Sequence, residues 1–221
     1  MVVGSFKKML GAAAVVGMLV VSSASASTLN VTYQGSNEFG SPNLSRYVDI
    51  TSPGYTGGSL AGPFRLTGDN QFNKFVAFCV DLTKYMTTGS TYTTSSTSVF
   101  GATVDGYIDR LFTSAYAGIS NRVQGAAFQV VLWEIISDTG SGYDLKSGSF
   151  KVASSRAVIR QANTYLAGLA GASTGGYNIT YLNSGNSQNL VTVAPVPLPA
   201  AFGMLGVGIA SLFGLRRRKK A

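Results

Sequence analysis

The two ends of the chain constrain its fold most, because each combines an apolar run with basic residues and neither has the pattern of a globular domain. At the N-terminus, Lys7 and Lys8 precede an apolar run from Met9 to Val21, and the small residues Ala24-Ser25-Ala26 follow. This order is typical of a secretory signal peptide. We therefore predict a signal peptide over residues 1–26, removed by signal peptidase. An uncleaved transmembrane anchor is the alternative.

The C-terminal end has the pattern of a membrane helix. Residues 200–215 are apolar and rich in glycine, and the chain then closes with five basic residues before Ala221: Arg216, Arg217, Arg218, Lys219 and Lys220. A helix of this length is marginal for a hydrocarbon layer ~30 Å thick. Basic residues beside a membrane helix stay on the cytoplasmic side. We therefore expect a C-terminal transmembrane helix in the inner membrane, with the middle of the chain exported.

Charge and composition exclude several function classes for the middle of the chain. Lys7, Lys8 and the five tail residues account for seven of the seventeen basic residues, which leaves ten against nine acidic ones, a net charge of +1. No basic surface for nucleic acid is expected. The chain has no histidine, which is the commonest metal ligand and general base. We expect no metal, no cofactor and no turnover enzyme.

The pattern of the remaining residues predicts one α+β domain over residues 27–194, with a strand-rich N-terminal half, about three helices and a C-terminal strand pair. The expected strands are Thr28–Tyr33, Tyr47–Thr51, Phe64–Thr67, Phe75–Leu82, Tyr177–Tyr181 and Asn189–Val193. The expected helices are two within Val104–Thr139, separated near residues 118–121, and a third over Ser154–Leu169. The proline-rich segment 194–199 is interpreted as a stiff linker.

Two pairs of carboxylates have helical spacing. Glu134 and Asp138 are four residues apart, as are Asp105 and Asp109. Paired carboxylates serve in acid/base catalysis, but this spacing is more typical of a solvated helix face. We interpret both pairs as solvated.

The tail, residues 195–221, carries a short motif ahead of its apolar segment: Val196, Pro197, Leu198, Pro199 and Ala200. With the helix and the basic cluster, it resembles the PEP-CTERM sorting signal, in its VPLPA variant. The resemblance implies processing by an exosortase in a Gram-negative bacterium, and a place at the cell surface or in an exopolysaccharide or biofilm matrix. The Pro-Glu-Pro core of the family is replaced by Pro-Leu-Pro, which leaves the cleaved bond open. An ordinary C-terminal anchor is the alternative.

Two stretches of the domain, residues 78–81 (FCVD) and 128–133 (FQVVLW), resemble the paired motifs of bacterial surface thioester domains. The resemblance implies that the thiol of Cys79 and the carboxamide of Gln129 condense to an internal thioester. It implies that Trp133 shields this bond, and it assigns Asp81 to the family's acidic position. Gln129 lies within an apolar helical stretch, so if buried it needs a hydrogen-bond or covalent partner.

The chain departs from that family at Phe128, where threonine is expected, and at Val131, where alanine is expected. Two functional hypotheses therefore stay open. One is a covalent adhesin that captures an amine-bearing surface ligand. The other is an inert structural or glycan-binding protein of an exopolysaccharide matrix. An exported hydrolase is disfavoured, because without histidine there is no ordinary catalytic triad.

The sorting prediction is tested by deleting Arg216–Lys220. We expect the truncated chain to lose membrane retention, because the positive charge that stops transfer is gone. Fractionation of cells that express each form measures this. Unchanged fractionation would contradict a membrane-anchoring tail.

Overall fold

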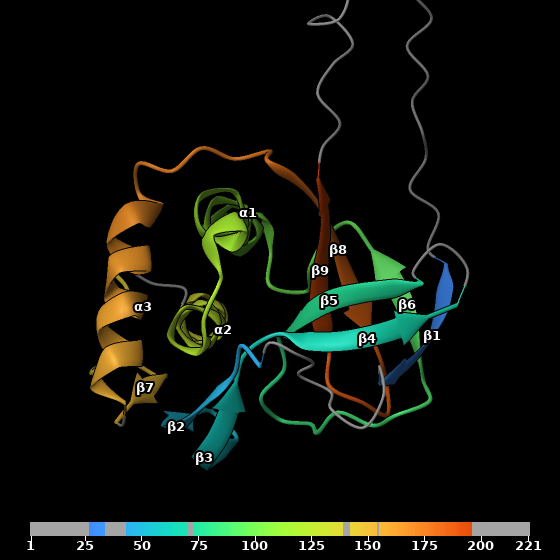
Figure 1. Cartoon of the computed structure of the whole chain (residues 1–221), viewed down its shortest axis with the longest axis horizontal. Helices are drawn as coiled ribbons and strands as arrows, with labels where there is room; N and C mark the ends of the chain where they lie inside the picture. The colour runs from blue at the N-terminus through green and yellow to red at the C-terminus, as the bar shows by residue number, and fades with distance from the viewer. Residues whose placement is uncertain (1–26, 34–42, 70–72, 139–141, 154, 196–221) are drawn as a thin grey trace, which may run out of the picture.

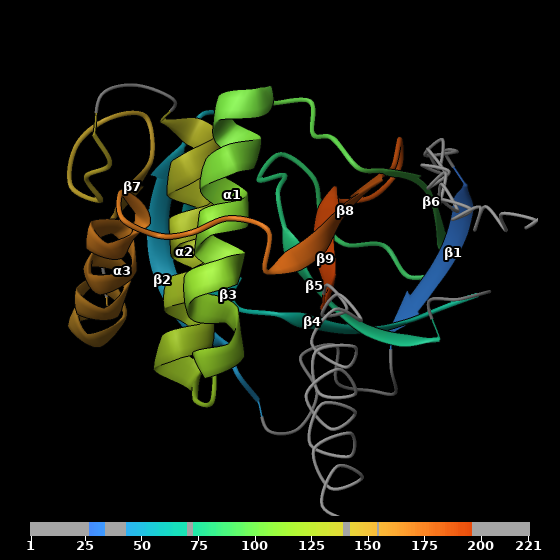
Figure 2. The same ribbon diagram turned by 90° about the horizontal axis from the view of Figure 1, so that it is seen from above.

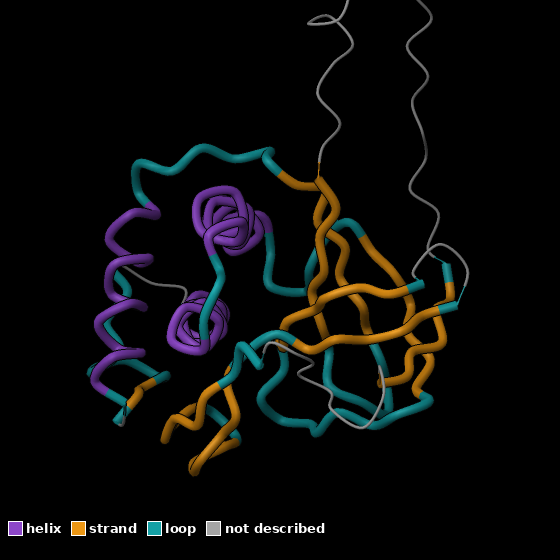
Figure 3. Tube along the Cα trace, viewed as in Figure 1, coloured by secondary structure: helices purple, strands orange, loops and turns teal. Residues whose placement is uncertain are grey.

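Six antiparallel strands close into a barrel, and three helices and a small second sheet lie against one side of it (Figures 1 and 3). The structure is a computed structural model, and it describes residues 27–33, 43–69, 73–138, 142–153 and 155–195. The predicted signal peptide, the motif Val196–Ala200, the C-terminal helix and the basic cluster Arg216–Lys220 lie outside the described residues. Within the described ranges, no helix is long and apolar enough to span a membrane.

The barrel follows the order β1-β4-β5-β9-β8-β6. Its strands are β1 (Thr28–Tyr33), β4 (Phe64–Gly68), β5 (Lys74–Cys79), β6 (Ser90–Ser95), β8 (Tyr177–Asn183) and β9 (Leu190–Pro195). Alternate residues of β6 are buried, with Tyr92 fully enclosed. Closure leaves no unpaired edge in this sheet, which removes a route to aggregation.

The second sheet has the order β3-β2-β7, formed by β2 (Arg46–Ser52), β3 (Tyr55–Ala61) and β7 (Lys151–Val152). Its hairpin turns at Pro53-Gly54, where Gly54 has a φ of 85° that favours glycine. Val48 and Ile50 on β2 alternate with exposed residues and face the core. This sheet therefore presents one apolar face to the helices.

Helix α2 (Arg122–Ser137) lies between the other two helices and the second sheet, on one side of the barrel, as the two ribbon views show (Figures 1 and 2). It contacts α1 (Ala102–Ala115), α3 (Arg156–Leu169), β2, β3 and β5, and its residues from Gly125 to Ile135 are all buried. A short 3-10 helix, η2 (Tyr116–Gly118), follows α1. Asn121 caps α2, and its side-chain oxygen accepts hydrogen bonds from the backbone N–H groups of Val123 and Gln124.

The α+β prediction is confirmed, with three α-helices near the expected positions and a C-terminal strand pair, β8 and β9. Strands β3, β6 and β7 were not predicted, because Gly57-Gly58 interrupts β3, β6 is mostly Ser and Thr, and β7 has two residues. The strand expected over Phe75–Leu82 ends at Cys79. The linker interpretation was wrong for residues 194 and 195, which still pair with β8 at the strand end, where a proline is tolerated.

Gly125 fixes how closely α2 approaches the chain before β2. A Cβ atom added at this position would collide with the backbone oxygen of Leu44 and lie 3.0 Å from the Leu44 Cβ atom. Gly106, on α1, has no heavy atom within 4 Å of the same added atom. Both glycines are inside α-helices, so they differ in packing rather than in backbone conformation.

We predict that Gly125→Ala lowers the free energy of unfolding by about 1–3 kcal/mol through overpacking. Gly106→Ala is the matched control, and we expect it to raise stability by roughly 0.5–1 kcal/mol, because alanine favours the helix. Chemical denaturation of both variants measures the difference. Equal stability changes would contradict the close approach at Leu44.

Candidate functional site

The side chain of Gln129 is bonded to the backbone of Cys79 through both ends of its carboxamide. The Cys79 N–H donates to Gln129 Oε1 at 2.9 Å, and Gln129 Nε2 donates to the Cys79 carbonyl oxygen at 2.8 Å. Both residues are 1% exposed. Cys79 is the last residue of β5 and Gln129 lies in the middle of α2, so a strand end and the central helix meet at this point. The structure therefore brings together the two residues that the thioester resemblance singled out.

The residues just before Cys79 and Gln129 pack together and so help to hold the end of β5 against α2. Phe78 and Phe128, each one position before the bonded pair, have ring centroids 4.6 Å apart. Phe112 of α1 adds edge contacts to both rings, at 5.8 Å to Phe78 and 4.9 Å to Phe128. Such aromatic contacts add to the stabilisation from burial. Phe128, which departs from the thioester motif, thus anchors α2 to β5.

The sulfur of Cys79 is held within its own loop. Cys79 Sγ donates to the carbonyl oxygen of Asp81 at 3.0 Å, and the Asp81 N–H donates to the sulfur at 3.3 Å. Burial raises the pKa of the Cys79 thiol to about 12, an effect partly offset by the Trp133 side chain and the Asp81 backbone. The thiol is therefore protonated at neutral pH and is a weak nucleophile towards reagents in solution.

Asp81 shapes the loop that follows β5. Its carboxylate Oδ1 accepts from the Thr83 N–H at 2.9 Å and from the Thr83 hydroxyl at 2.7 Å, which is the pattern of an Asx turn. The role of Asp81 here is to orient the backbone beside the sulfur. Its carboxylate makes no hydrogen bond to Cys79 among those found in the described residues.

Gln188 is a site residue that the sequence interpretation missed. It lies between β8 and β9, and its Nε2 donates to the carbonyl oxygens of Asp81 and Lys84, at 3.1 Å each. Its Oε1 is buried without a hydrogen-bond partner in the described part of the chain. A polar residue in a Ser/Asn-rich loop carries no sequence signal of such a contact, because the pairing of β5 with β9 brings it to the loop that follows Cys79.

Trp133 lies one helical turn after Gln129 and is 2% exposed. Its ring packs against Phe150, with centroids 6.2 Å apart. The indole Nε1 is buried and makes no hydrogen bond of ordinary geometry with any described residue. Such an orphaned donor is uncommon in a protein core.

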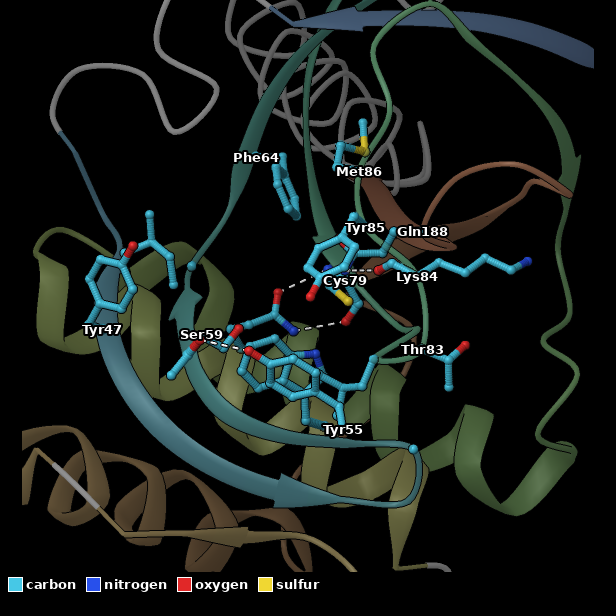
Figure 4. Close-up of a pocket in the computed structure, with 17 residues that line it drawn as sticks. Tyr47, Tyr55, Ser59, Phe64, Cys79, Thr83, Lys84, Tyr85, Met86 and Gln188 are labelled. Carbon is cyan, nitrogen blue, oxygen red and sulfur yellow. Dashed lines mark hydrogen bonds between the residues drawn. The ribbon is translucent and has the colours of Figure 1, made fainter.

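Cys79, Gln129, Trp133 and Gln188 all line one pocket of about 530 Å³ between the second sheet and the loop after β5 (Figure 4). Tyr47, Tyr55 and Tyr85 surround it in this view, and Tyr47 and Tyr85 are 70% and 80% exposed. A pocket of this size admits a small group or the end of a long side chain. The bonded pair is thus buried yet borders a space that a small molecule can enter.

The interpretation of Glu134 as part of a solvated face was wrong. Glu134 is fully buried, and its Oε1 accepts from the Asp144 N–H at 2.7 Å while Oε2 has no hydrogen-bond partner in the described residues. Asp138 accepts from the backbone N–H groups of Ser149 and Phe150, at 2.7 and 2.9 Å. Both carboxylates therefore organise the segment between α2 and β7. The burial of α2 on all sides explains the error.

Asp105 and Asp109 are likewise structural and half-buried. Asp105 accepts from the Tyr181 hydroxyl at 2.8 Å, and Asp109 accepts from the Gly175 N–H at 3.0 Å. They tie α1 to β8 and to the segment before it. Among the described residues, no three His, Cys, Asp or Glu side chains are grouped so that they could hold a metal ion.

The sequence matches no protein-family model, and no curated protein matches it either. Two solved structures are similar at 13% identity and a TM-score of 0.47. One is the N-terminal domain of the pilus tip adhesin Cpa from Streptococcus pyogenes, with 76% of this chain and 94% of that chain covered. The other is the N-terminal thioester domain of a surface protein from Clostridium perfringens, with 77% and 100% covered. At these values the likenesses assign no function to this chain.

Glu134 makes the stability of the domain depend on pH. Burial, with a smaller contribution from Asp138 and Asp144, raises the pKa of Glu134 from 4.5 to about 7. Because the folded state binds this proton more tightly than the unfolded state, the free energy of unfolding falls as pH rises from about 4.5 to 7.

We predict that Glu134→Gln flattens this pH dependence and that the variant is more stable than the original chain at pH values above that range. The glutamine keeps an acceptor for the Asp144 N–H and carries no charge. Denaturation of both forms across this pH range measures the effect. If the free energy of unfolding depends on pH equally in both forms, the assignment of this pH dependence to Glu134 is wrong.

Proposed function

We propose that the chain is an exported cell-surface or matrix protein whose domain forms an internal thioester between Cys79 and Gln129 and uses it once to bond a partner covalently. The observation that carries this proposal is the pair of hydrogen bonds between the Gln129 carboxamide and the Cys79 backbone, at the wall of an open pocket. Such a protein is a single-use adhesin and not a turnover enzyme.

The hydrogen bonds suit the condensation. When Cys79 Sγ attacks the Gln129 carbonyl carbon, negative charge develops on Oε1, where the Cys79 N–H already donates. The thiol proton passes to the departing nitrogen, and ammonia leaves. Because both groups are held together by the fold, the reaction is intramolecular, which favours it greatly over the same exchange in water.

Export and sorting belong to the same proposal. The pattern of residues 1–26 supports signal peptidase cleavage, and the motif Val196–Ala200 with its helix and basic cluster supports processing by an exosortase. The chain is then held briefly at the inner membrane of a Gram-negative bacterium before release to the surface or matrix. An amine-bearing surface ligand or exopolysaccharide is the partner in this proposal.

A second candidate is an inert structural or glycan-binding matrix protein. One observation favours it: the two hydrogen bonds already satisfy the buried carboxamide without a covalent bond. The exposed rings of Tyr47 and Tyr85 beside the pocket also suit stacking on a sugar. In this case Cys79 is a buried apolar residue.

The intact mass of the purified folded chain separates the two candidates. We predict a mass below that of the sequence by one ammonia, and that methylamine adds its own mass to this form by leaving a methylamide at Gln129. Cys79→Ala and Gln129→Ala should both abolish the deficit. Gln161→Ala, a glutamine on α3 away from the pair, is the matched control and should keep it. A full mass, with Cys79 alkylated after unfolding, would favour the inert candidate.

A further inference from the structure

The buried indole N–H of Trp133 makes no hydrogen bond of ordinary geometry with a described residue, although a donor buried without a bond destabilises a protein. A shield against water needs no polar atom, so shielding alone does not account for this N–H. Trp133 borders the same pocket as Cys79 and Gln129 and is carried by the same helix as Gln129. The indole therefore belongs to the reacting site by position.

The Trp133 side chain also acts on the sulfur. It lowers the pKa of the Cys79 thiol against the larger opposing effect of burial. Yet no hydrogen bond of ordinary geometry joins Nε1 to the neutral thiol, whose proton is donated to the Asp81 carbonyl. The donor is thus arranged to favour a negatively charged sulfur over a neutral one. An interaction that strengthens as charge develops accelerates a reaction, whereas one that is equal in both states does not.

Other sources of positive charge are missing from the pocket lining. Lys84 is the single cation among the lining residues, and its Nζ donates to the Ser184 carbonyl oxygen at 3.1 Å. In Figure 4 its side chain extends away from Cys79. The sulfur therefore depends on neutral donors for any charge that it acquires.

We propose that the indole N–H of Trp133 donates to Cys79 Sγ when the thioester opens, and so stabilises the departing thiolate. This inference rests on the proposed function. An amine nitrogen bonds to the Gln129 acyl carbon, the carbon–sulfur bond breaks, and its electron pair goes to sulfur. The proton that the amine loses passes to the thiolate, which regains the bond to the Asp81 carbonyl. Trp133 thereby acts on the leaving group in addition to covering the bond.

The rate at which methylamine opens the thioester distinguishes hydrogen-bond donation by Trp133 from shielding, because loss of the donor slows opening and loss of the shield speeds it. Trp133→Phe keeps an aromatic cover and removes the N–H. We expect methylamine to open the thioester of this variant roughly tenfold more slowly, the effect of losing one hydrogen bond to a charged group. The rate is measured by intact mass at intervals on protein that has completed thioester formation. Equal or faster opening would overturn the proposal, because a lost shield speeds opening.

Phe150→Leu is the matched control, since it loosens the packing of Trp133 and keeps the N–H. We expect its opening to be as fast as in the original chain or faster. Slow opening in this variant as well would assign the effect to packing and overturn the donor role.

A second measurement needs no change at Trp133 and no thioester. The chain has a single tryptophan, so ¹⁵N-indole labelling yields one indole resonance. In Gln129→Ala, with a free thiol, we expect this resonance to move downfield as alkaline pH ionises Cys79. It should stay in place when Cys79→Ala is added. An indole resonance that does not move with pH in either variant would overturn the donor role. An intact mass equal to that of the sequence would overturn the thioester and leave the donor role to this measurement.

Discussion

The contact between the Gln129 carboxamide and the Cys79 backbone is the interaction on which the site depends. Two hydrogen bonds of 2.9 and 2.8 Å fix a helix side chain on the end of a barrel strand. They satisfy a polar group that would otherwise be buried without a partner. The same two bonds hold the carboxamide at the Cys79 backbone, with the Cys79 N–H donating to its oxygen. The same geometry satisfies a buried carboxamide and holds it next to Cys79. This is why the inert candidate and the proposed thioester candidate share one site.

This geometry requires that α2 be buried on every side. The Asn121 cap starts the helix, Gly125 lets it approach the backbone at Leu44, and Phe128 packs it on Phe78. A helix enclosed in this way must bury its polar residues too. Gln129 and Glu134 are both on it, and each is accommodated by backbone groups from elsewhere in the chain.

Several polar atoms near these contacts stay without partners in the described residues, among them Trp133 Nε1 and Gln188 Oε1. Both belong to side chains that line the pocket beside Cys79. A polar atom buried without a partner is uncommon in a native core. One of the two atoms is a donor and the other is an acceptor.

The sequence by itself determined the fold class, the three helices and most strands, because apolar periodicity and turn residues are local signals. It also singled out Cys79, Gln129 and Trp133, through two short motifs. Tertiary structure alone decided the burial of Glu134, the hidden strand β6 and the arrival of Gln188 at the site. Each of these depends on which distant part of the chain packs against the residue. A helix covered by two helices and a sheet, and a barrel that closes on itself, bring together residues about 100 positions apart, which no local pattern records.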